Sequence, residues 1–208
     1  MKALRLNRLL LRSSTLGLTP KSVLTNQGAL NEMIFTIIGM AGCGKSCMGR
    51  ALSSRLKIKL IDSDKLIEKR MEKKLQVLID ELGVDEFRRI EEETLLSIES
   101  PENEHLIIST GGSAIYSTKA MDYLKSKGKI IYLYCGFLTI QERLGDYSKR
   151  GVVLKDGQTL LDLYNERAPM YESYADFTVN CNGNAYPIYQ RVAASAIKRY
   201  IKETEPKT

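Results

Sequence analysis

A glycine-rich segment, Gly39-Met-Ala-Gly-Cys-Gly-Lys45-Ser46, has the residue types and spacing of a phosphate-binding loop. It fits G-x-x-x-x-G-K-[ST] at every fixed position. Glycines let the backbone wrap a triphosphate closely, and amides at the start of the following helix point at anionic oxygens. The Lys45 ammonium would reach the β- and γ-phosphates, and the Ser46 hydroxyl would bind Mg²⁺. The residues predicted to bind the nucleotide are Gly42, Cys43, Gly44, Lys45, Ser46 and Cys47.

Two carboxylates, Asp62 and Asp64, stand at the end of the next apolar run. Residues i and i+2 of a strand point the same way, so both carboxylates can face one cleft. Beside a magnesium–nucleotide site, one acid would hold metal-bound water and the other the acceptor hydroxyl. An ordinary helix N-cap explains the same residues. Their position one strand–helix unit after the phosphate loop favours the functional interpretation.

Two further segments complete the set of candidates. Phe87-Arg88-Arg89-Ile90-Glu91 has the pattern of a helix, and Thr110-Gly111-Gly112-Ser113-Ala114 follows an apolar run. Glycines at the carboxyl end of a parallel strand let a ligand approach the backbone, which is where open α/β sheets bind substrates. Taken alone, the Gly-Gly pair fits a plain tight turn just as well.

Short apolar runs alternate with helical stretches of ten or more residues from Met33 onward. This alternation predicts an α/β fold with a parallel sheet covered by helices on both faces. A chain of 208 residues suits one such domain, which we place at residues 33–208. The predicted strands are Ile34–Ile38, Lys59–Ile61, Leu106–Ser109, Ile130–Tyr134 and Phe177–Val179.

The net charge of +6 is concentrated in the first 31 residues, which hold five basic and no acidic side chains. The remaining residues carry 26 basic and 25 acidic side chains, so we expect no sequence-independent binding of nucleic acid. No apolar run approaches the roughly 20 residues of a membrane-spanning helix, so we expect no membrane contact. The four cysteines and single histidine have no metal-ligand spacing, which predicts reduced, unpaired thiols.

The basic leader, residues 1–32, interleaves leucines with arginines before a Ser/Thr-rich stretch. Such an amphipathic segment without acids is typical of organelle transit peptides, which would send the protein to a mitochondrion or plastid. The alternatives are an N-terminal extension of a cytoplasmic protein, or a true start at Met33. Under either interpretation we exclude residues 1–32 from the fold.

The length favours a small-molecule kinase over a motor ATPase, and the Asn-Lys-x-Asp loop typical of GTP-specific switches is absent. In their order along the chain, the motifs resemble those of the shikimate kinase family. The likeness runs from about Ile34 to Val179. The motifs that carry it are Gly39–Ser46, Asp62-Ser-Asp64, Glu86-Phe-Arg-Arg-Ile-Glu91, Thr110–Ala114, Lys149-Arg150 and Arg167-Ala-Pro-Met-Tyr171.

The resemblance implies a five-stranded parallel sheet of the P-loop nucleoside-monophosphate-kinase type. It implies that the γ-phosphate of ATP passes to the 3-hydroxyl of shikimate, in aromatic amino-acid biosynthesis. Asp64 would bind the acceptor hydroxyls, and Asp62 would help organise Mg²⁺. Arg88 and Arg167 would hold the substrate carboxylate, since a guanidinium fork matches a carboxylate. Gly111, Gly112 and the neighbouring backbone would line the substrate pocket. We expect the enzyme to be a monomer.

Two further arginines receive roles from the same resemblance. Arg150, in a lid at about residues 145–156, would close over the phosphates and act in catalysis with Lys45 and Asp64. Arg143 would lie along the adenine. An ordinary surface position competes with each arginine role, with Arg88 pairing to Glu91 or Glu92.

Two departures from the family pattern bear on the acceptor. The usual three-glycine loop ends in Ser113 here, and Gly151 follows Arg150 where a proline is common. The alternatives to shikimate are another small hydroxy-acid or polyol such as gluconate, or a nucleotide-binding module without catalysis. The retained Lys45, Ser46, Asp62, Asp64 and Arg150 argue against the module.

Overall fold

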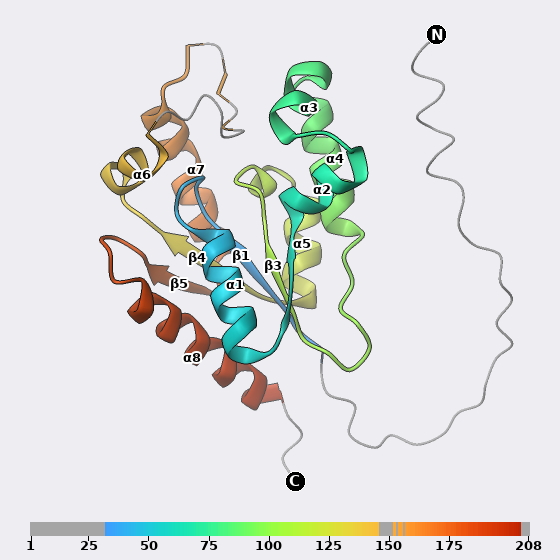
Figure 1. Cartoon of the computed structure of the whole chain (residues 1–208), viewed down its shortest axis with the longest axis vertical. Helices are drawn as coiled ribbons and strands as arrows, with labels where there is room; N and C mark the ends of the chain where they lie inside the picture. Colours follow the sequence, from blue (N-terminus) through green and yellow to red (C-terminus); the bar gives the residue numbers. More distant parts are fainter. Residues whose placement is uncertain (1–31, 146–151, 153, 156, 205–208) are drawn as a thin grey trace, which may run out of the picture.

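A computed structural model describes residues 32–145, 152, 154–155 and 157–204 of the chain, and its five strands form one parallel sheet (Figure 1). The order across the sheet is β2-β3-β1-β4-β5. The predicted five-stranded parallel sheet is therefore confirmed. The strands are β1 (Ile34–Ile38), β2 (Lys59–Asp62), β3 (Leu106–Ser109), β4 (Gly128–Tyr134) and β5 (Phe177–Asn180).

The predicted helices on both faces are also present. Helix α1 packs beside α8, and α4 packs beside α5. In Figure 1, α1 and α8 lie in front of the sheet and α5 lies behind it. The helices are α1 (Lys45–Leu56), α2 (Ser63–Met71), α3 (Leu75–Leu82), α4 (Val84–Leu96), the short 3₁₀ helix η2 (Ala114–Tyr116), α5 (Thr118–Lys127), α6 (Phe137–Leu144), α7 (Leu160–Tyr174) and α8 (Tyr186–Thr204).

The main core forms around the central strands. All five residues of β1 are buried, as expected for a strand with helices on both faces. The ring of Tyr132, on β4, stacks on the ring of Tyr171, on α7, with a centroid distance of 5.3 Å. This contact holds α7 against the sheet close to the ends of the strands.

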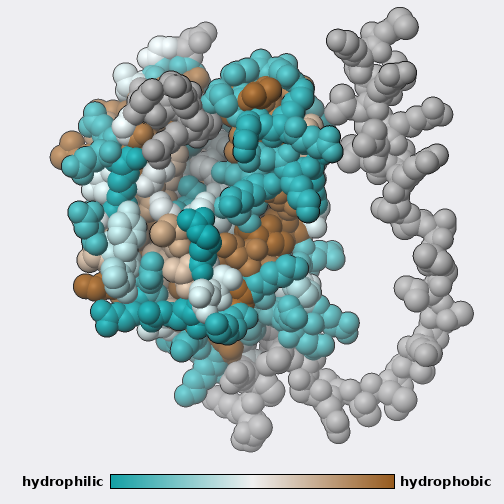
Figure 2. Space-filling model, in the orientation of Figure 1, coloured by the Kyte–Doolittle hydropathy of each residue, from teal (hydrophilic) through white to brown (hydrophobic). Residues whose placement is uncertain are grey.

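A second, smaller core lies within the unit formed by α2, α3 and α4. It consists of Ile67, Leu78, Ile79 and Phe87. The outer surface of this unit is mostly hydrophilic in Figure 2. Because the unit has its own core, α2 and α4 keep a fixed relation to each other while they project beyond the strands.

Several sequence predictions lie outside the described residues. These are the leader up to residue 31, and Lys149 and Arg150 in the predicted lid. Of the four cysteines, Cys43, Cys135 and Cys181 are buried and Cys47 is exposed, and all are free thiols as predicted. No described helix is long and apolar enough to cross a membrane.

Gly39, directly after β1, provides a test of how tightly the sheet and loop pack. Its φ is +145°, and a Cβ here would lie 2.8 Å from the Leu133 carbonyl oxygen and 2.9 Å from Cys43 Sγ. Gly83 has φ +80° with no heavy atom within 4 Å of a Cβ. We predict that Gly39→Ala lowers the free energy of unfolding by about 1–3 kcal/mol more than Gly83→Ala. Equal losses in urea denaturation would contradict the packing described.

Candidate active site

The phosphate-binding loop joins β1 to α1 and puts Lys45 at the first position of the helix. Gly44, the N-cap residue, has φ 100° and supplies no side chain to the first helix amides. The Lys45 ammonium donates hydrogen bonds to the carbonyl oxygens of Gly39 (2.8 Å) and Met40 (3.0 Å). The loop therefore gathers a lysine and the positive end of a helix in one place.

The loop has the shape that a triphosphate requires. A Cβ at Gly42 would lie 2.9 Å from Leu144 Cγ, so there is no room for a side chain where the backbone turns. Because the Cys43 side chain is buried, only its backbone could make the predicted contact. Ser46 lines the cavity in front of the loop, and Cys47 lies exposed at its rim. The donor set fits a nucleotide with a hard cation, because a hydroxyl oxygen suits Mg²⁺.

The two aspartates occupy different elements, and the prediction that strand spacing points both carboxylates into one cleft is wrong. Asp62 is the last residue of β2 and caps α2, with its carboxylate accepting from the Lys65 amide at 3.3 Å. Asp64 lies in the first turn of α2. Of the two, Asp64 is the one that lines the cavity. The N-cap interpretation thus holds for Asp62, while Asp64 reaches the site from the helix.

The loop Gly111-Gly112-Ser113 forms the opposite wall. The Gly111 amide donates to the Ser63 hydroxyl (3.1 Å), and the Gly112 carbonyl accepts from the Tyr171 hydroxyl (2.6 Å). A Cβ at Gly111 would collide with Glu91 Oε1 and lie 2.7 Å from Asp64 Oδ1. The absence of a side chain at Gly111 therefore lets two carboxylates converge on the same loop.

Glu91 is a site residue that the sequence analysis did not single out. It is only 2% exposed and projects from α4. Its Oε2 accepts from the Ser113 hydroxyl at 2.6 Å, and its Oε1 is buried without a hydrogen-bond partner. The sequence signal was present as a glutamate ending the Glu86–Glu91 motif, but its burial depends on packing between α4 and the glycine loop.

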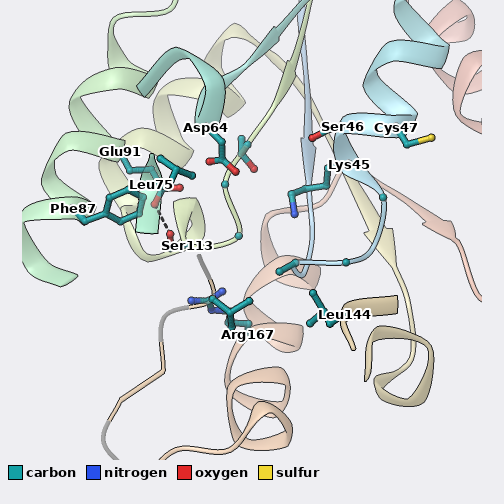
Figure 3. A pocket seen from close by; sticks show the side chains of 17 residues that line it. Lys45, Ser46, Cys47, Asp64, Leu75, Phe87, Glu91, Ser113, Leu144 and Arg167 are labelled. Carbon is teal, nitrogen blue, oxygen red and sulfur yellow. Dashed lines mark hydrogen bonds between the residues drawn. The ribbon is translucent and has the colours of Figure 1, made fainter. Parts of the chain in front are cut away.

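A cavity of about 330 Å³ opens between these walls. In Figure 3, Asp64 and Glu91 project from one side of the cavity, Lys45 faces them from the phosphate loop, and Arg167 lies across the cavity from Asp64. The residues lining it are Ala41, Gly42, Gly44, Lys45, Ser46, Cys47, Asp64, Leu75, Phe87, Glu91, Thr110, Gly111, Gly112, Ser113, Leu144, Val152 and Arg167.

The two predicted substrate arginines meet at one tyrosine. Arg167, on α7, is 3% exposed and lines the main cavity. Arg88, on α4, lines a smaller neighbouring cavity with Glu91 and Ser113. Both guanidinium groups lie over the ring of Tyr116, with centroid distances of 4.1 Å for Arg88 and 5.1 Å for Arg167. In the described part of the chain, no ion pair joins Arg88 to an acid.

Arg143 is held by the protein itself. Its guanidinium donates to the carbonyl oxygens of Cys181 (2.9 Å) and Gly183 (2.6 Å), and lies 5.1 Å from the centre of the Tyr186 ring. A Cβ at Gly44 would lie 3.8 Å from that same ring, so Arg143 stands close to the phosphate loop. It is therefore not a free surface arginine, and its contact with adenine stays a prediction.

The cavity changes the acidity of its carboxyl groups. Burial raises the pKa of Asp64 to about 6, with Lys45 opposing the rise and the charges of Asp62 and Glu68 adding to it. Burial likewise raises the pKa of Glu91 to about 7, and the Ser113 hydrogen bond opposes this effect. Both carboxyl groups therefore exchange protons closer to neutral pH than ordinary side chains.

The first strand of the parallel sheet leads into a phosphate loop, and in the cavity beside this loop a carboxylate faces a lysine. These features define a P-loop kinase of small molecules. The family model for shikimate kinase matches residues 41–201. The chain belongs to the shikimate kinase family, which confirms the resemblance drawn from the motifs.

Individual proteins agree with this assignment. The shikimate kinase of Francisella tularensis subsp. novicida (strain U112) is 36% identical over 149 residues, 71% of this chain and 84% of that protein. The structure of shikimate kinase from Acinetobacter baumannii in complex with shikimate has a TM-score of 0.72 and 26% identity, covering 82% of this chain and 96% of that one. A gluconokinase from Sinorhizobium meliloti 1021 has a TM-score of 0.52 and 18% identity over 84% of this chain and 96% of its own, and shares the fold alone.

Glu91 allows a test of the raised pKa values in the cavity. Its pKa of about 7 in the folded protein lies above the ordinary value, so the stability it contributes falls as pH rises from about 4.5 through 7. Glu91→Gln keeps an oxygen for Ser113 and removes the buried charge. We predict that it raises the free energy of unfolding at pH 8 by on the order of 1–3 kcal/mol, with little effect at pH 4.5.

The matched control is Glu93→Gln, an exposed glutamate on the same helix that pairs with Arg89. It should change stability by less than about 1 kcal/mol at either pH. Urea denaturation at several pH values measures both variants. A Glu91→Gln protein with the wild-type pH dependence would show that Glu91 is not buried as a carboxyl group.

Proposed function

We propose that the protein transfers the γ-phosphoryl group of ATP to the 3-hydroxyl of shikimate. The observation that carries the proposal is the arrangement of Lys45, Asp64 and Arg167 along one cavity. A phosphate-binding cation, a carboxylate and a buried guanidinium line the same cavity from three different helices. This combination of groups suits a small acceptor that carries both a hydroxyl group and a carboxylate.

At the nucleotide end, the chain supplies charge and position. The amides of the phosphate loop and the Lys45 ammonium would hold the β- and γ-phosphates, and the Ser46 hydroxyl would hold Mg²⁺. Asp62 would act on the cation through water, because one of its carboxylate oxygens already caps α2. When bound, ATP with Mg²⁺ supplies the phosphoryl group and neutralises part of its charge.

At the acceptor end, Asp64 would accept the proton of the attacking hydroxyl. A carboxyl group with a pKa of about 6 is ionised at neutral pH yet basic enough to take a proton. Arg167 would bind the acceptor carboxylate together with Arg88, and we call this pair the carboxylate clamp. The Gly112 backbone lies beside Arg167 and the phosphate loop and would form the floor, since a Cβ there would lie 3.2 Å from Arg167 Nη1 and 3.5 Å from the Ala41 nitrogen.

Two substitutions test the nucleotide end and the acceptor end of the site separately. Lys45→Ala removes charge from the phosphates, whereas Asp64→Asn removes the proton acceptor. Both should lower kcat by on the order of 10² to 10⁴, but only Lys45→Ala should raise the KM for ATP strongly. In the wild type, kcat/KM for shikimate should fall as the pH drops through about 6, because Asp64 becomes protonated.

The controls are Lys59→Ala and Asp122→Asn, which change exposed residues that do not line the cavity. Both should keep nearly wild-type kinetics. Steady-state assays with ATP and shikimate measure all four variants. Full activity of Asp64→Asn would mean that another group accepts the proton, and the acceptor site would be misassigned.

A further inference from the structure

Tyr116 lies against both arginines of the carboxylate clamp. It is the last residue of η2 and is half-buried between α4 and α7. Its ring centre is 4.1 Å from Cζ of Arg88 and 5.1 Å from Cζ of Arg167. Guanidinium groups at these distances are attracted to the electron-rich face of a tyrosine ring. One side chain therefore contacts two cations that come from different helices.

The hydroxyl group of Tyr116 is fixed as well. It accepts a hydrogen bond from Arg167 Nε at 3.2 Å and donates one to Glu166 Oε1 at 2.7 Å. Glu166 in turn accepts from Gln158 at 2.7 Å and pairs with Lys155 at 3.4 Å. The Tyr116 hydrogen bond lowers the pKa of Glu166, and Gln158 and Lys155 add to this effect, so the acceptor of the tyrosine proton stays ionised.

This arrangement leaves N–H groups of both arginines for hydrogen bonds to a ligand. A guanidinium has five N–H groups, and Arg167 uses the one on Nε for Tyr116. Its Nη1 lies next to Gly112 in the main cavity. Arg88 Nε is buried without a hydrogen-bond partner, and its guanidinium lies over the ring of Tyr116.

We propose that Tyr116 is a positioning residue that sets the orientation of Arg88 and Arg167 toward the acceptor carboxylate. The proposal rests on the proposed function, since it assigns a task to the clamp of that same site. Tyr116 lies outside every motif that identifies the family in this sequence. It acts through the two arginines and does not line the main cavity.

The test uses two substitutions in the full chain. Tyr116→Phe keeps the ring and removes only the hydroxyl, whereas Tyr116→Leu removes both contacts. The clamp holds a part of the acceptor that does not react, so its loss should weaken binding more than chemistry. We expect the KM for shikimate to rise about 3- to 10-fold in Tyr116→Phe and about 10- to 100-fold in Tyr116→Leu. We expect kcat to change less than about 3-fold and the KM for ATP to stay constant.

Tyr123 gives a matched control. Its hydroxyl donates to the Ile98 carbonyl at 2.8 Å, and Lys127 Nζ lies 5.6 Å from its ring centre, so it makes the same kinds of contact away from the site. Tyr123→Phe and Tyr123→Leu should lower the melting temperature without changing the KM for shikimate. If both tyrosines gave the same kinetic result, Tyr116 would be a packing residue only.

A double-substitution cycle separates positioning from general damage. If Tyr116 acts through Arg167, then Tyr116→Phe should have little further effect on the KM for shikimate in an Arg167→Lys background. If the KM increase in the double variant equalled the product of the two single increases, the positioning role would be overturned. A wild-type KM in both Tyr116 variants would overturn it too. A wild-type chain without shikimate-dependent ATP turnover would instead overturn the proposed function, and the positioning role with it. Tyr116→Phe carries the test if Tyr116→Leu fails to fold.

Discussion

Two carboxylates and two cations share one partly enclosed cavity, and most of the fold can be understood as the means of holding them there. Asp64 and Glu91 face Lys45 and Arg167 across about 330 Å³ of space. Charges in such surroundings are costly unless opposite charges and hydrogen bonds compensate them. Because the four groups come from four different helices, the balance survives only if those helices keep fixed positions.

The parallel sheet supplies that rigidity. Its strands all end at one edge, so the phosphate loop after β1, the first turn of α2 and the glycine loop after β3 converge without any long connection. Thr110 ties two of these segments together, since its amide and hydroxyl both donate to the Ile37 carbonyl, at 3.2 and 3.1 Å. The small core within α2–α4 then fixes the helices of Asp64 and Glu91 relative to each other.

The sequence was sufficient where local pattern decides structure. The apolar runs and the spacing of Gly39–Ser46 predicted the strands and the loop, because a buried parallel strand and a phosphate loop leave plain local signals. The i, i+2 argument of a strand was applied to Asp62 and Asp64, but α2 begins at Ser63, so only Asp62 lies on the strand. Glu91 and Tyr116 were overlooked because their roles arise only when α4, η2 and α7 pack together, which no local pattern records.

The central claim is that the site recognises its acceptor by a carboxylate held by Arg88 and Arg167. The most direct measurement compares kcat/KM for shikimate with that for its carboxamide, in the wild type, Arg88→Lys and Arg167→Lys. Lysine keeps the charge and loses the fork, so each variant should use the acid about 30- to 1000-fold less well, with ATP affinity near wild type. The carboxamide should be poor for the wild type and lose little more in either variant. Lysine variants that use the acid normally, or a carboxamide that serves as well as the acid, would contradict the account.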